Sequence, residues 1–403
     1  MTPTLYLTRN GLLEPLGQSQ VLAYLRGLSR DHRITLITRE KAEDWADAES
    51  VARVRAECLA LGIDWRPRPF RPRPRFIAPA LDLISMTHEV WRAARDGRAQ
   101  LVHARSYIPA AVAWVVWRLT GVPFIFDMRA LWPEELITAG RLQRGSWLYR
   151  RIVAVERACL RDAAGVVSLT QAAVAHLHKV YPAEMAGQRV AVIPTCADLE
   201  RFLPRAPVPP APRVYGCIGT VLSGWFRLDW LAAFIAAAAE RDGTAQFDIV
   251  TRDDAVQVRA ALDPDGALGA RLTIGPRAHS DMPAAVAGHD VSVMFYAGGE
   301  VSELGRSPTR MAEVLGTAIP VVANAGVGDV ARIVEDHRVG VLATGPETMT
   351  QTLDDLDHLL ADADLPARCR AAAEAVFSLE AGTRDYRTLY AEILAPAPQD
   401  DLR

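Results

Sequence analysis

Lysine is almost absent from this 403-residue chain, since only Lys41 and Lys179 occur and none follows residue 200. Any cationic phosphate ligand in the second half must therefore be an arginine. The five cysteines are scattered without a C-x-x-C spacing. That pattern indicates a reducing compartment and argues against a structural zinc site.

Long hydrophobic segments are also lacking. No basic region followed by an apolar core opens the chain, so we expect no signal peptide. The longest uncharged apolar runs, around 108–117 and 230–239, have about half the length that a membrane span needs. We therefore expect a soluble or peripheral protein.

Half of the residues are apolar, and the length suggests two packed domains. Charge is unevenly spread. Residues 1–200 carry 27 Lys and Arg against 20 Asp and Glu, and the remainder carries 18 against 28. The basic first half and the acidic second half suggest different partners, although compositional drift would give the same pattern.

Short apolar runs alternate with helical patterns throughout and predict an α/β fold. Because the runs are apolar on both faces, they indicate parallel sheets covered on both sides. The strands expected in the first half are 4–8, 33–38, 101–104, 124–127, 165–169 and 190–194. Those expected in the second half are 214–220, 247–251, 271–274, 291–296, 319–323 and 339–343.

Five prolines within residues 204–212 predict a stiff linker. We therefore expect two doubly wound Rossmann-like domains, 1–203 and 214–378, joined by a linker at 204–213 and facing each other across a cleft. A last helix, 379–395, has one apolar face and is expected to pack back toward the N-terminal domain. In such sheets ligands bind beyond the carboxyl ends of the strands.

The segment 307–313, Ser-Pro-Thr-Arg-Met-Ala-Glu, combines a helix start with anion-binding groups. The first N–H groups of a helix lack intrahelical partners, and the helix dipole favours an anion. Ser307 and Thr309 add hydroxyls, and Arg310 adds a fixed positive charge. The set suits a diphosphate beside a hydroxyl-rich group, as in a nucleotide-sugar. The alternative is an ordinary capped helix.

Several motifs, in order, resemble those of the retaining glycosyltransferases of family 4, which have the GT-B fold. Pro-Thr-Arg at 308–310 with Glu313, then Pro-Val-Val-Ala at 320–323, resembles the family's donor-site block. The further motifs are Glu-Pro-Leu-Gly-Gln-Ser-Gln at 14–20, His-Ala-Arg-Ser at 103–106, Asp-Met-Arg at 127–129, Trp-Pro-Glu-Glu at 132–135 and Ile-Pro-Thr-Cys-Ala-Asp-Leu at 193–199.

The resemblance implies transfer of a sugar from a nucleotide-sugar to a glycan or lipid-linked acceptor, with retained anomeric configuration and with no metal or other cofactor. The C-terminal domain would bind the donor. The expected donor-binding residues are Gly17, Gly219, Thr220, Arg227, Ser307, Pro308, Thr309, Arg310 and Glu313. The expected acceptor-binding residues are His103, Arg105, Trp132 and Glu134, and the expected catalytic residues are Asp127, Arg129, Arg310 and Glu313.

The chain departs from the family pattern at the donor site. Gly305 stands where the family has the first glutamate of Glu-x7-Glu, and whether Glu300 or Glu303 replaces it stays open. Arg310 stands where the family usually has lysine. A second usual lysine is missing near Phe226, where Arg227 is the adjacent cation. These departures leave the identity of the donor open.

Residues 66–76 hold five arginines and four prolines and predict an extended loop. We interpret it as a contact for an anionic membrane surface or a lipid-pyrophosphate acceptor, with a solvated loop as the alternative. Nucleic acid is not an expected partner. The expected location is cytoplasmic, either free or attached peripherally to the inner face of the plasma membrane. The expected role is cell-envelope or exopolysaccharide synthesis.

Three other functions are weighed against this one. A nucleotide-sugar epimerase or hydrolase of the same fold would need a carboxylate pair that moves protons at the sugar. A nicotinamide-dependent oxidoreductase disagrees with the loop after residues 4–8, which lacks Gly-x-Gly-x-x-Gly. A nucleotide-sugar-binding homologue with weak or no activity is suggested by Gly305.

Overall fold

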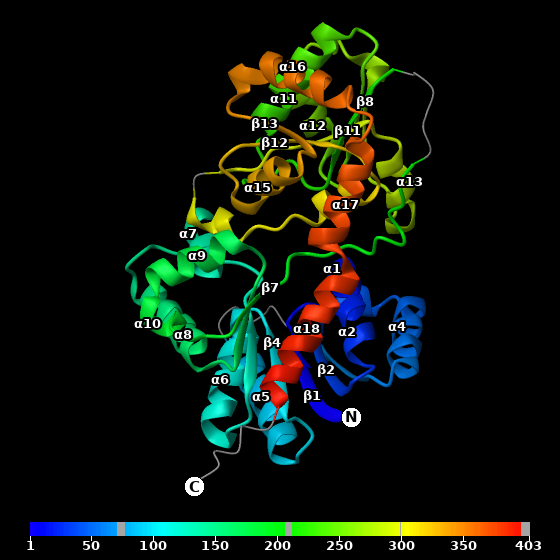
Figure 1. Ribbon diagram of the computed structural model, residues 1–403. Helices are drawn as coiled ribbons and strands as arrows, with labels where there is room; N and C mark the ends of the chain where they lie inside the picture. The colour runs from blue at the N-terminus through cyan, green and yellow to red at the C-terminus, as the bar shows by residue number, and fades with distance from the viewer. Residues whose placement is uncertain (71–76, 206–211, 299, 396–403) are drawn as a thin grey trace. The chain divides into compact units, whose positions relative to one another are not determined.

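The computed structural model describes residues 1–70, 77–205, 212–298 and 300–395. The chain forms two compact units. Unit 1 comprises Met1–Pro194 with the segment from Leu379 onward, and unit 2 comprises Thr195–Ser378. Each unit is built on a parallel β-sheet flanked by helices (Figure 1). No helix in the described part of the chain is long and apolar enough to cross a membrane.

The boundary between the units lies nine residues before the expected one at 203. The segment after Pro194 packs with unit 2, where Leu199 and Phe202 are buried. Nη1 of Arg370 donates to the carbonyl oxygens of Leu199 (3.2 Å) and Phe202 (2.8 Å). These contacts explain the shift of the boundary. Most of the expected linker, residues 206–211, lies outside the described residues.

Unit 1 contains a seven-stranded sheet in the order β3-β2-β1-β4-β5-β6-β7, with every neighbouring pair parallel. Its strands are β1 (Thr2–Leu7), β2 (His32–Glu40), β3 (Asp64–Pro69), β4 (Leu101–Arg105), β5 (Phe124–Asp127), β6 (Gly165–Ser168) and β7 (Val190–Val192). The chain leaves β1 toward β2 and β3 and then returns to the other side at β4. The topological switch point therefore lies between β1 and β4.

The start of the arginine-rich segment is not a loop, as the composition predicted, but the edge strand β3. The N–H of Phe70 donates to the carbonyl of Glu40 on β2 (2.7 Å). Alternation then turns Pro67 and Pro69, which lack an N–H, toward the open edge, where no partner strand needs a donor. Arg66 pairs with Asp64 (2.5 Å), and residues 71–76 lie outside the described residues.

The helices of unit 1 connect these strands. They are α1 (Pro15–Gly17), the π-helical turn η1 (Gln18–Leu22), α2 (Ala23–Leu28), α3 (Ala42–Trp45), α4 (Ala48–Ala60), α5 (Ile77–Arg95), α6 (Tyr107–Thr120), α7 (Trp132–Thr138), α8 (Trp147–Asp162), α9 (Gln171–Val180), α10 (Pro182–Met185) and the C-terminal α18 (Leu379–Leu394). Helix α18 packs on α2 and β7 and buries Tyr386, Leu389 and Tyr390, three residues of its predicted apolar face.

Unit 2 contains a six-stranded parallel sheet in the order β10-β9-β8-β11-β12-β13. Its strands are β8 (Val214–Ile218), β9 (Gln246–Val250), β10 (Leu272–Gly275), β11 (Val291–Met294), β12 (Val321–Asn324) and β13 (Gly340–Ala343). The switch point of this sheet lies between β8 and β11.

The helices of unit 2 follow the same alternation. They are α11 (Leu228–Arg241), α12 (Ala255–Leu262), α13 (Met282–Ala287), α14 (Thr309–Gly316), α15 (Gly328–His337), α16 (Met349–Leu360), α17 (Leu365–Phe377) and the 3-10 turns η2 (Gly269–Arg271), η3 (His279–Asp281), η4 (Val301–Gly305) and η5 (Pro346–Thr348).

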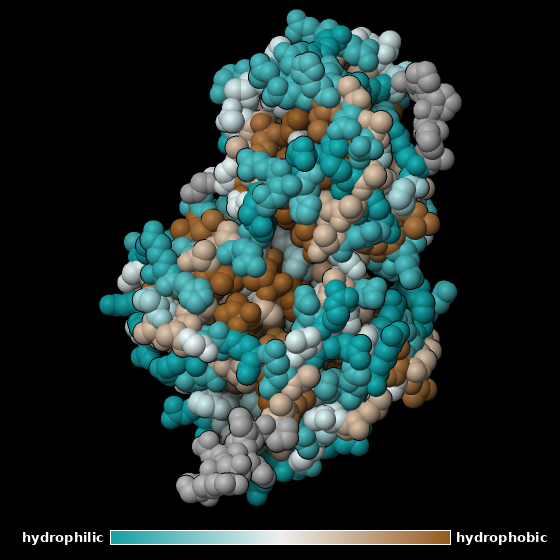
Figure 2. Space-filling model, in the orientation of Figure 1, coloured by the Kyte–Doolittle hydropathy of each residue, from teal (hydrophilic) through white to brown (hydrophobic). Residues whose placement is uncertain are grey.

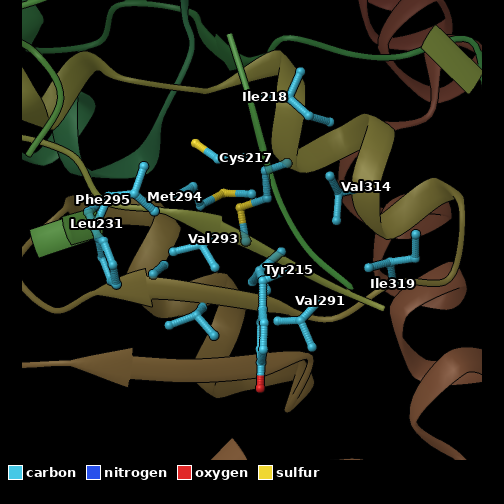
Figure 3. Close-up of a cluster of buried hydrophobic side chains, with 14 of the residues drawn as sticks. Tyr215, Cys217, Ile218, Leu231, Val291, Val293, Met294, Phe295, Val314 and Ile319 are labelled. Atoms are coloured by element: carbon cyan, nitrogen blue, oxygen red, sulfur yellow. The ribbon is translucent and has the colours of Figure 1, made fainter. Parts of the chain in front are cut away.

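Buried apolar side chains fix α11 and α14 to the sheet of unit 2. Figure 3 shows Tyr215 and Cys217 of β8, Val293 of β11, Leu231 of α11 and Val314 of α14 in one cluster. All are less than 5% exposed. Most of the visible surface is hydrophilic, with smaller hydrophobic areas (Figure 2). Burial of Val314 sets the position of the first turn of α14, which carries part of the predicted donor-site motif.

Candidate functional site

Arg310 lies at the switch point of the sheet in unit 2. It belongs to the first turn of α14, and its guanidinium lies over Gly219, at the end of β8. The guanidinium carbon is also 5.5 Å from the ring centre of Tyr296, which follows β11, and 5.9 Å from that of Phe226. The structure thus places this predicted cation where ligands of doubly wound sheets bind.

Gly219 leaves room for that guanidinium. A Cβ at this position would lie 2.6 Å from Nη2 of Arg310, and the backbone has a φ of +97°, which side chains other than glycine rarely adopt. Arg310 Nη1 is buried and has no hydrogen-bond partner among the described residues. A buried guanidinium nitrogen without an acceptor is costly, and an anionic ligand would satisfy it.

Backbone N–H groups near Arg310 are only partly available. The N–H of Gly219, a predicted donor-binding residue, donates to the carbonyl of Val250 (2.8 Å), so it is not free to bind a ligand. The N–H groups of Val221 (2.6 Å) and Leu222 (2.9 Å) donate to the carboxylate of Asp253. Thr220, between them, is exposed.

The start of α14 is less occupied than the Gly219 loop. Pro308 precedes the helix in extended conformation, and no acceptor in the described part of the chain is found for the N–H groups of Thr309 and Arg310. Ser307 Oγ accepts from the N–H of Thr195 (3.0 Å), so this hydroxyl also fixes the segment that enters unit 2. Two helix N–H groups and one guanidinium therefore remain for an anion.

Glu313 follows one turn after Arg310 and is half-buried. Burial raises the pKa of its carboxyl from 4.5 to about 7, although Arg201 and Arg310 act in the opposite direction. A carboxyl with this pKa accepts hydrogen bonds from hydroxyls as a carboxylate and exchanges a proton near neutral pH.

Other predicted donor residues are engaged elsewhere. Arg227 pairs with Asp229 (2.6 Å) and lies over the ring of Trp230, at the start of α11. Glu303 is buried and pairs with Arg306 (2.9 Å), whereas Glu300 is exposed. These pairs account for the charges of Arg227 and Glu303 without a ligand.

Gly17, in unit 1, is explained by close packing. A Cβ there would lie 2.0 Å from the carbonyl oxygen of Gly11 and 2.7 Å from Cα of Leu12. The residue is buried, and the next N–H, that of Gln18, donates to the carbonyl of Glu14 (3.0 Å). We therefore assign Gly17 to the packing of the turn before η1 rather than to donor binding.

Asp127, at the end of β5, is the centre of a buried charge network in unit 1. Its side chain is fully buried and receives a hydrogen bond from the hydroxyl of Tyr386 on α18 (3.0 Å). Its carboxylate lies 3.2 Å from His103 Nε2, 3.6 Å from Arg105 Nη1 and 3.6 Å from Arg129 Nη1.

Burial and the charges within this network shift the pKa values of Asp127 and His103. Burial alone would raise the pKa of Asp127, but Arg129 and the hydrogen bond from His103 hold it well below its ordinary value. Burial lowers the pKa of His103, which is 1% exposed. Arg105 is 3% exposed, so neither residue presents its side chain to an acceptor, contrary to the expectation. We assign Asp127, His103, Arg105 and Arg129 to a structural ion network.

Trp132, the first residue of α7, lines a polar cavity of about 410 Å³ at the switch point of unit 1. This polar cavity is formed by Arg9, Asn10, Glu14, Arg39, Lys41, Phe70, Ser106, Tyr107, Ile108, Pro109 and Trp132. Glu134, two residues after Trp132, instead forms an ion pair with Arg144. Among the predicted acceptor residues, Trp132 thus lines this polar cavity, whereas Glu134 is not part of its lining.

Sequence reasoning did not single out several residues that lie around Arg310 in the structure. Tyr296 and Arg306 pack beside each other, with the guanidinium carbon 5.3 Å from the ring centre. Asn324 bridges both backbone polar groups of Tyr296 at 2.8 Å. Both Tyr296 and Asn324 lie at strand ends, the one sequence signal that could have indicated them.

No group of three or more His, Cys, Asp and Glu side chains that could hold a metal is found among the described residues. The expected independence from metal stays a prediction.

Comparison with known proteins agrees with this architecture. Residues 17–201 match the family model described as Glycosyltransferase Family 4. Comparison with curated protein sequences gave no match. A sucrose-phosphate synthase from Thermosynechococcus elongatus is similar in structure, with a TM-score of 0.70 at 16% identity over 98% of this chain and 100% of that chain.

Two further solved structures show the range of similar proteins. HepE of Anabaena, in complex with UDP and glucose, has a TM-score of 0.64 at 16% identity over 97% of this chain and 100% of that chain. A putative UDP-N-acetylglucosamine 2-epimerase from Listeria monocytogenes has a TM-score of 0.61 at 10% identity over 98% of each chain. At these identities the likeness concerns the fold. The chain has two Rossmann-like parallel-sheet domains, as in GT-B glycosyltransferases, and its first half resembles Glycosyltransferase Family 4.

Proposed function

We propose that this protein is a retaining glycosyltransferase that binds a nucleoside-diphosphate sugar on unit 2. The observation that carries the proposal is the buried, unpartnered Nη1 of Arg310 at the switch point, beside the free N–H groups that open α14. A diphosphate offers the acceptor oxygens that these donors lack. The match of the first half to Glycosyltransferase Family 4 supports the class of reaction.

The proposed reaction transfers the sugar on one face. The bond from the anomeric carbon to the diphosphate oxygen breaks, the acceptor oxygen bonds to that carbon, and the leaving diphosphate takes the acceptor's proton. Arg310 would stabilise the charge that develops on the diphosphate, and Glu313 would accept hydrogen bonds from ribose hydroxyls. In this account no metal is needed for charge neutralisation, and the product serves cell-envelope or exopolysaccharide synthesis.

A thermal-shift panel of nucleoside diphosphates and their sugar derivatives tests the donor class. We expect the nucleotides of one base to raise the Tm in a concentration-dependent way, because a ligand that binds only the folded chain stabilises it. The rise should also occur in the presence of EDTA. The rise should disappear in Arg310→Ala. Absence of any shift across the panel would contradict the proposal and favour a homologue without donor binding.

An epimerase or hydrolase of the same fold is the second candidate, and one observation favours it. Burial raises the pKa of Glu313 to about 7, so its carboxyl exchanges a proton near neutral pH, as an acid or base at a sugar must. Conversion of the nucleotide-sugar without any acceptor would support this candidate. Conversion that requires an acceptor would support the transferase.

A further inference from the structure

A second cavity in unit 1 adjoins the polar cavity and is mainly apolar. This apolar cavity has a volume of about 400 Å³. Side chains of α5, α6, α7, α8 and the strand ends line it, among them Arg9, Tyr107, Ile108, Ala111, Trp132 and Glu156. Its volume falls within the range of cavities that hold small organic ligands.

The two cavities share one wall. Arg9, Tyr107, Ile108 and Trp132 line both of them. The rings of Tyr107 and Trp132 are 5.5 Å apart, and the hydroxyl of Tyr107 lies 2.7 Å from the carboxylate of Glu156, which holds the tyrosine in place. A single ligand that passes this wall would have one polar and one apolar part.

The polar cavity has the features of an anion site. No carboxylate in the described part of the chain pairs with Arg9, and its Nε is buried without a hydrogen-bond partner. By contrast, Arg39 pairs with Asp82 (2.5 Å) and Lys41 with Glu14 (3.4 Å). Arg9 therefore carries the uncompensated charge of this cavity.

The start of α6 adds to this preference. Ser106, Tyr107 and Ile108, which line the polar cavity, form the N-cap and first turn of this 14-residue helix. The first N–H groups of a helix lack intrahelical partners, and the helix dipole is positive at this end. Ser106 has a φ of +78°, a strained conformation that is common at functional sites.

Exposed apolar residues continue the apolar character on the same helices. Leu81 (60% exposed) and Ile84 (64%) lie on α5, and Trp147 (66%) and Leu148 (50%) lie on α8. Both helices also line the apolar cavity. Two of the helices that line the apolar cavity therefore also expose apolar side chains to solvent.

We propose that these adjoining cavities bind the phosphate or diphosphate ester of a long apolar alcohol as the sugar acceptor. The phosphate lies in the polar cavity on Arg9 and the start of α6, and the apolar chain enters the apolar cavity past Ile108 and Ala111. The role of this ligand as sugar acceptor rests on the proposed function. Binding of the ligand does not require that the protein transfers a sugar.

Isothermal titration of the whole protein with farnesyl diphosphate, below its aggregation concentration, tests the site. Inorganic diphosphate and farnesol are the matched half-ligands. We expect farnesyl diphosphate to bind at least about tenfold more tightly than either one, since each buried methylene contributes about fourfold. Equal affinities for farnesyl diphosphate and inorganic diphosphate would show that the site binds only the anion, and would overturn the proposal.

Two variants locate the ligand. Ala111→Phe fills the apolar cavity and should lower the affinity for farnesyl diphosphate about tenfold while leaving that for inorganic diphosphate unchanged. Leu119→Phe, at a 66% exposed position of the same helix, is its control. Arg9→Gln should weaken both phosphates by about tenfold, as for loss of a charged hydrogen bond, and exposed Arg33→Gln should weaken neither.

A parallel titration with the nucleoside diphosphate separates this inference from the proposed function. Intact nucleotide binding with no preference for farnesyl diphosphate would refute the inference alone. Intact farnesyl diphosphate binding with no binding of any nucleotide would refute the donor site and keep the amphiphile site. Unchanged farnesyl diphosphate affinity in both Ala111→Phe and Arg9→Gln would place the ligand elsewhere and also overturn the inference.

Discussion

Removal of the Arg310 guanidinium should abolish most of the donor affinity. In the free protein its Nη1 is buried and makes no hydrogen bond to a described residue, so a diphosphate gains at least one charge-assisted hydrogen bond there. Such a bond contributes about 1.5–3 kcal/mol. Arg310→Ala should therefore raise the Kd of the best nucleoside diphosphate by about ten- to hundredfold.

Isothermal titration of wild type, Arg310→Ala and Arg310→Lys measures this effect. The lysine variant keeps the charge but loses the planar geometry, so we expect an intermediate Kd. Arg332→Ala is the control, because Arg332 is exposed on α15 and its ion pairs with Asp329 and Asp336 are long surface pairs of 3.4 Å. A Kd of Arg310→Ala within twofold of wild type, in a variant with normal Tm, would refute the reasoning.

Three further predictions concern single residues. Gly219→Ala should cost about 1–3 kcal/mol of stability through its positive φ and should weaken nucleotide binding by displacing Arg310, as urea unfolding and titration would show. Glu313 is protonated in the folded chain up to about pH 7 but ionises near 4.5 when unfolded, so wild type should lose up to about 3 kcal/mol relative to Glu313→Gln as pH rises from 4 to 8. Asp127→Asn leaves Arg105 and Arg129 without a counter-charge and should cost about 3–5 kcal/mol in urea unfolding.

Each of these has a contrary outcome. Unchanged nucleotide affinity in Gly219→Ala would mean that Arg310 need not lie over this glycine. A stability difference between wild type and Glu313→Gln that does not vary with pH would contradict the raised pKa. A fully stable but inactive Asp127→Asn would return Asp127 to catalysis, the role that the family resemblance implied.

The sheets could be predicted because their strands are apolar on both faces and separated by helical patterns. Strand β3 could not be predicted from the sequence. Pro67 and Pro69 argue against a strand unless that strand is known to lie at the edge of a sheet. The donor-site motif was found because Arg310 and Glu313 belong to one local segment, whose chemistry shows in its order of residues.

Which of the other predicted groups are buried or already hydrogen-bonded depends on contacts between segments far apart in the chain. Asp253 takes the N–H groups of Val221 and Leu222 only because the loops after β8 and β9 meet. Asp127 is buried partly by Tyr386, which follows it by 259 residues. Sequence reasoning correctly placed Asp127 at a strand end but had no signal that α18 would cover it.

Release of nucleoside diphosphate from a panel of nucleotide-sugars, in EDTA and with a polyprenyl phosphate or diphosphate acceptor, tests the central claim most directly. The account predicts release from one donor, dependent on acceptor, with the anomeric configuration retained in the product and with activity lost in Arg310→Ala. Turnover that strictly requires a divalent metal, or that persists unchanged in Arg310→Ala, would contradict it.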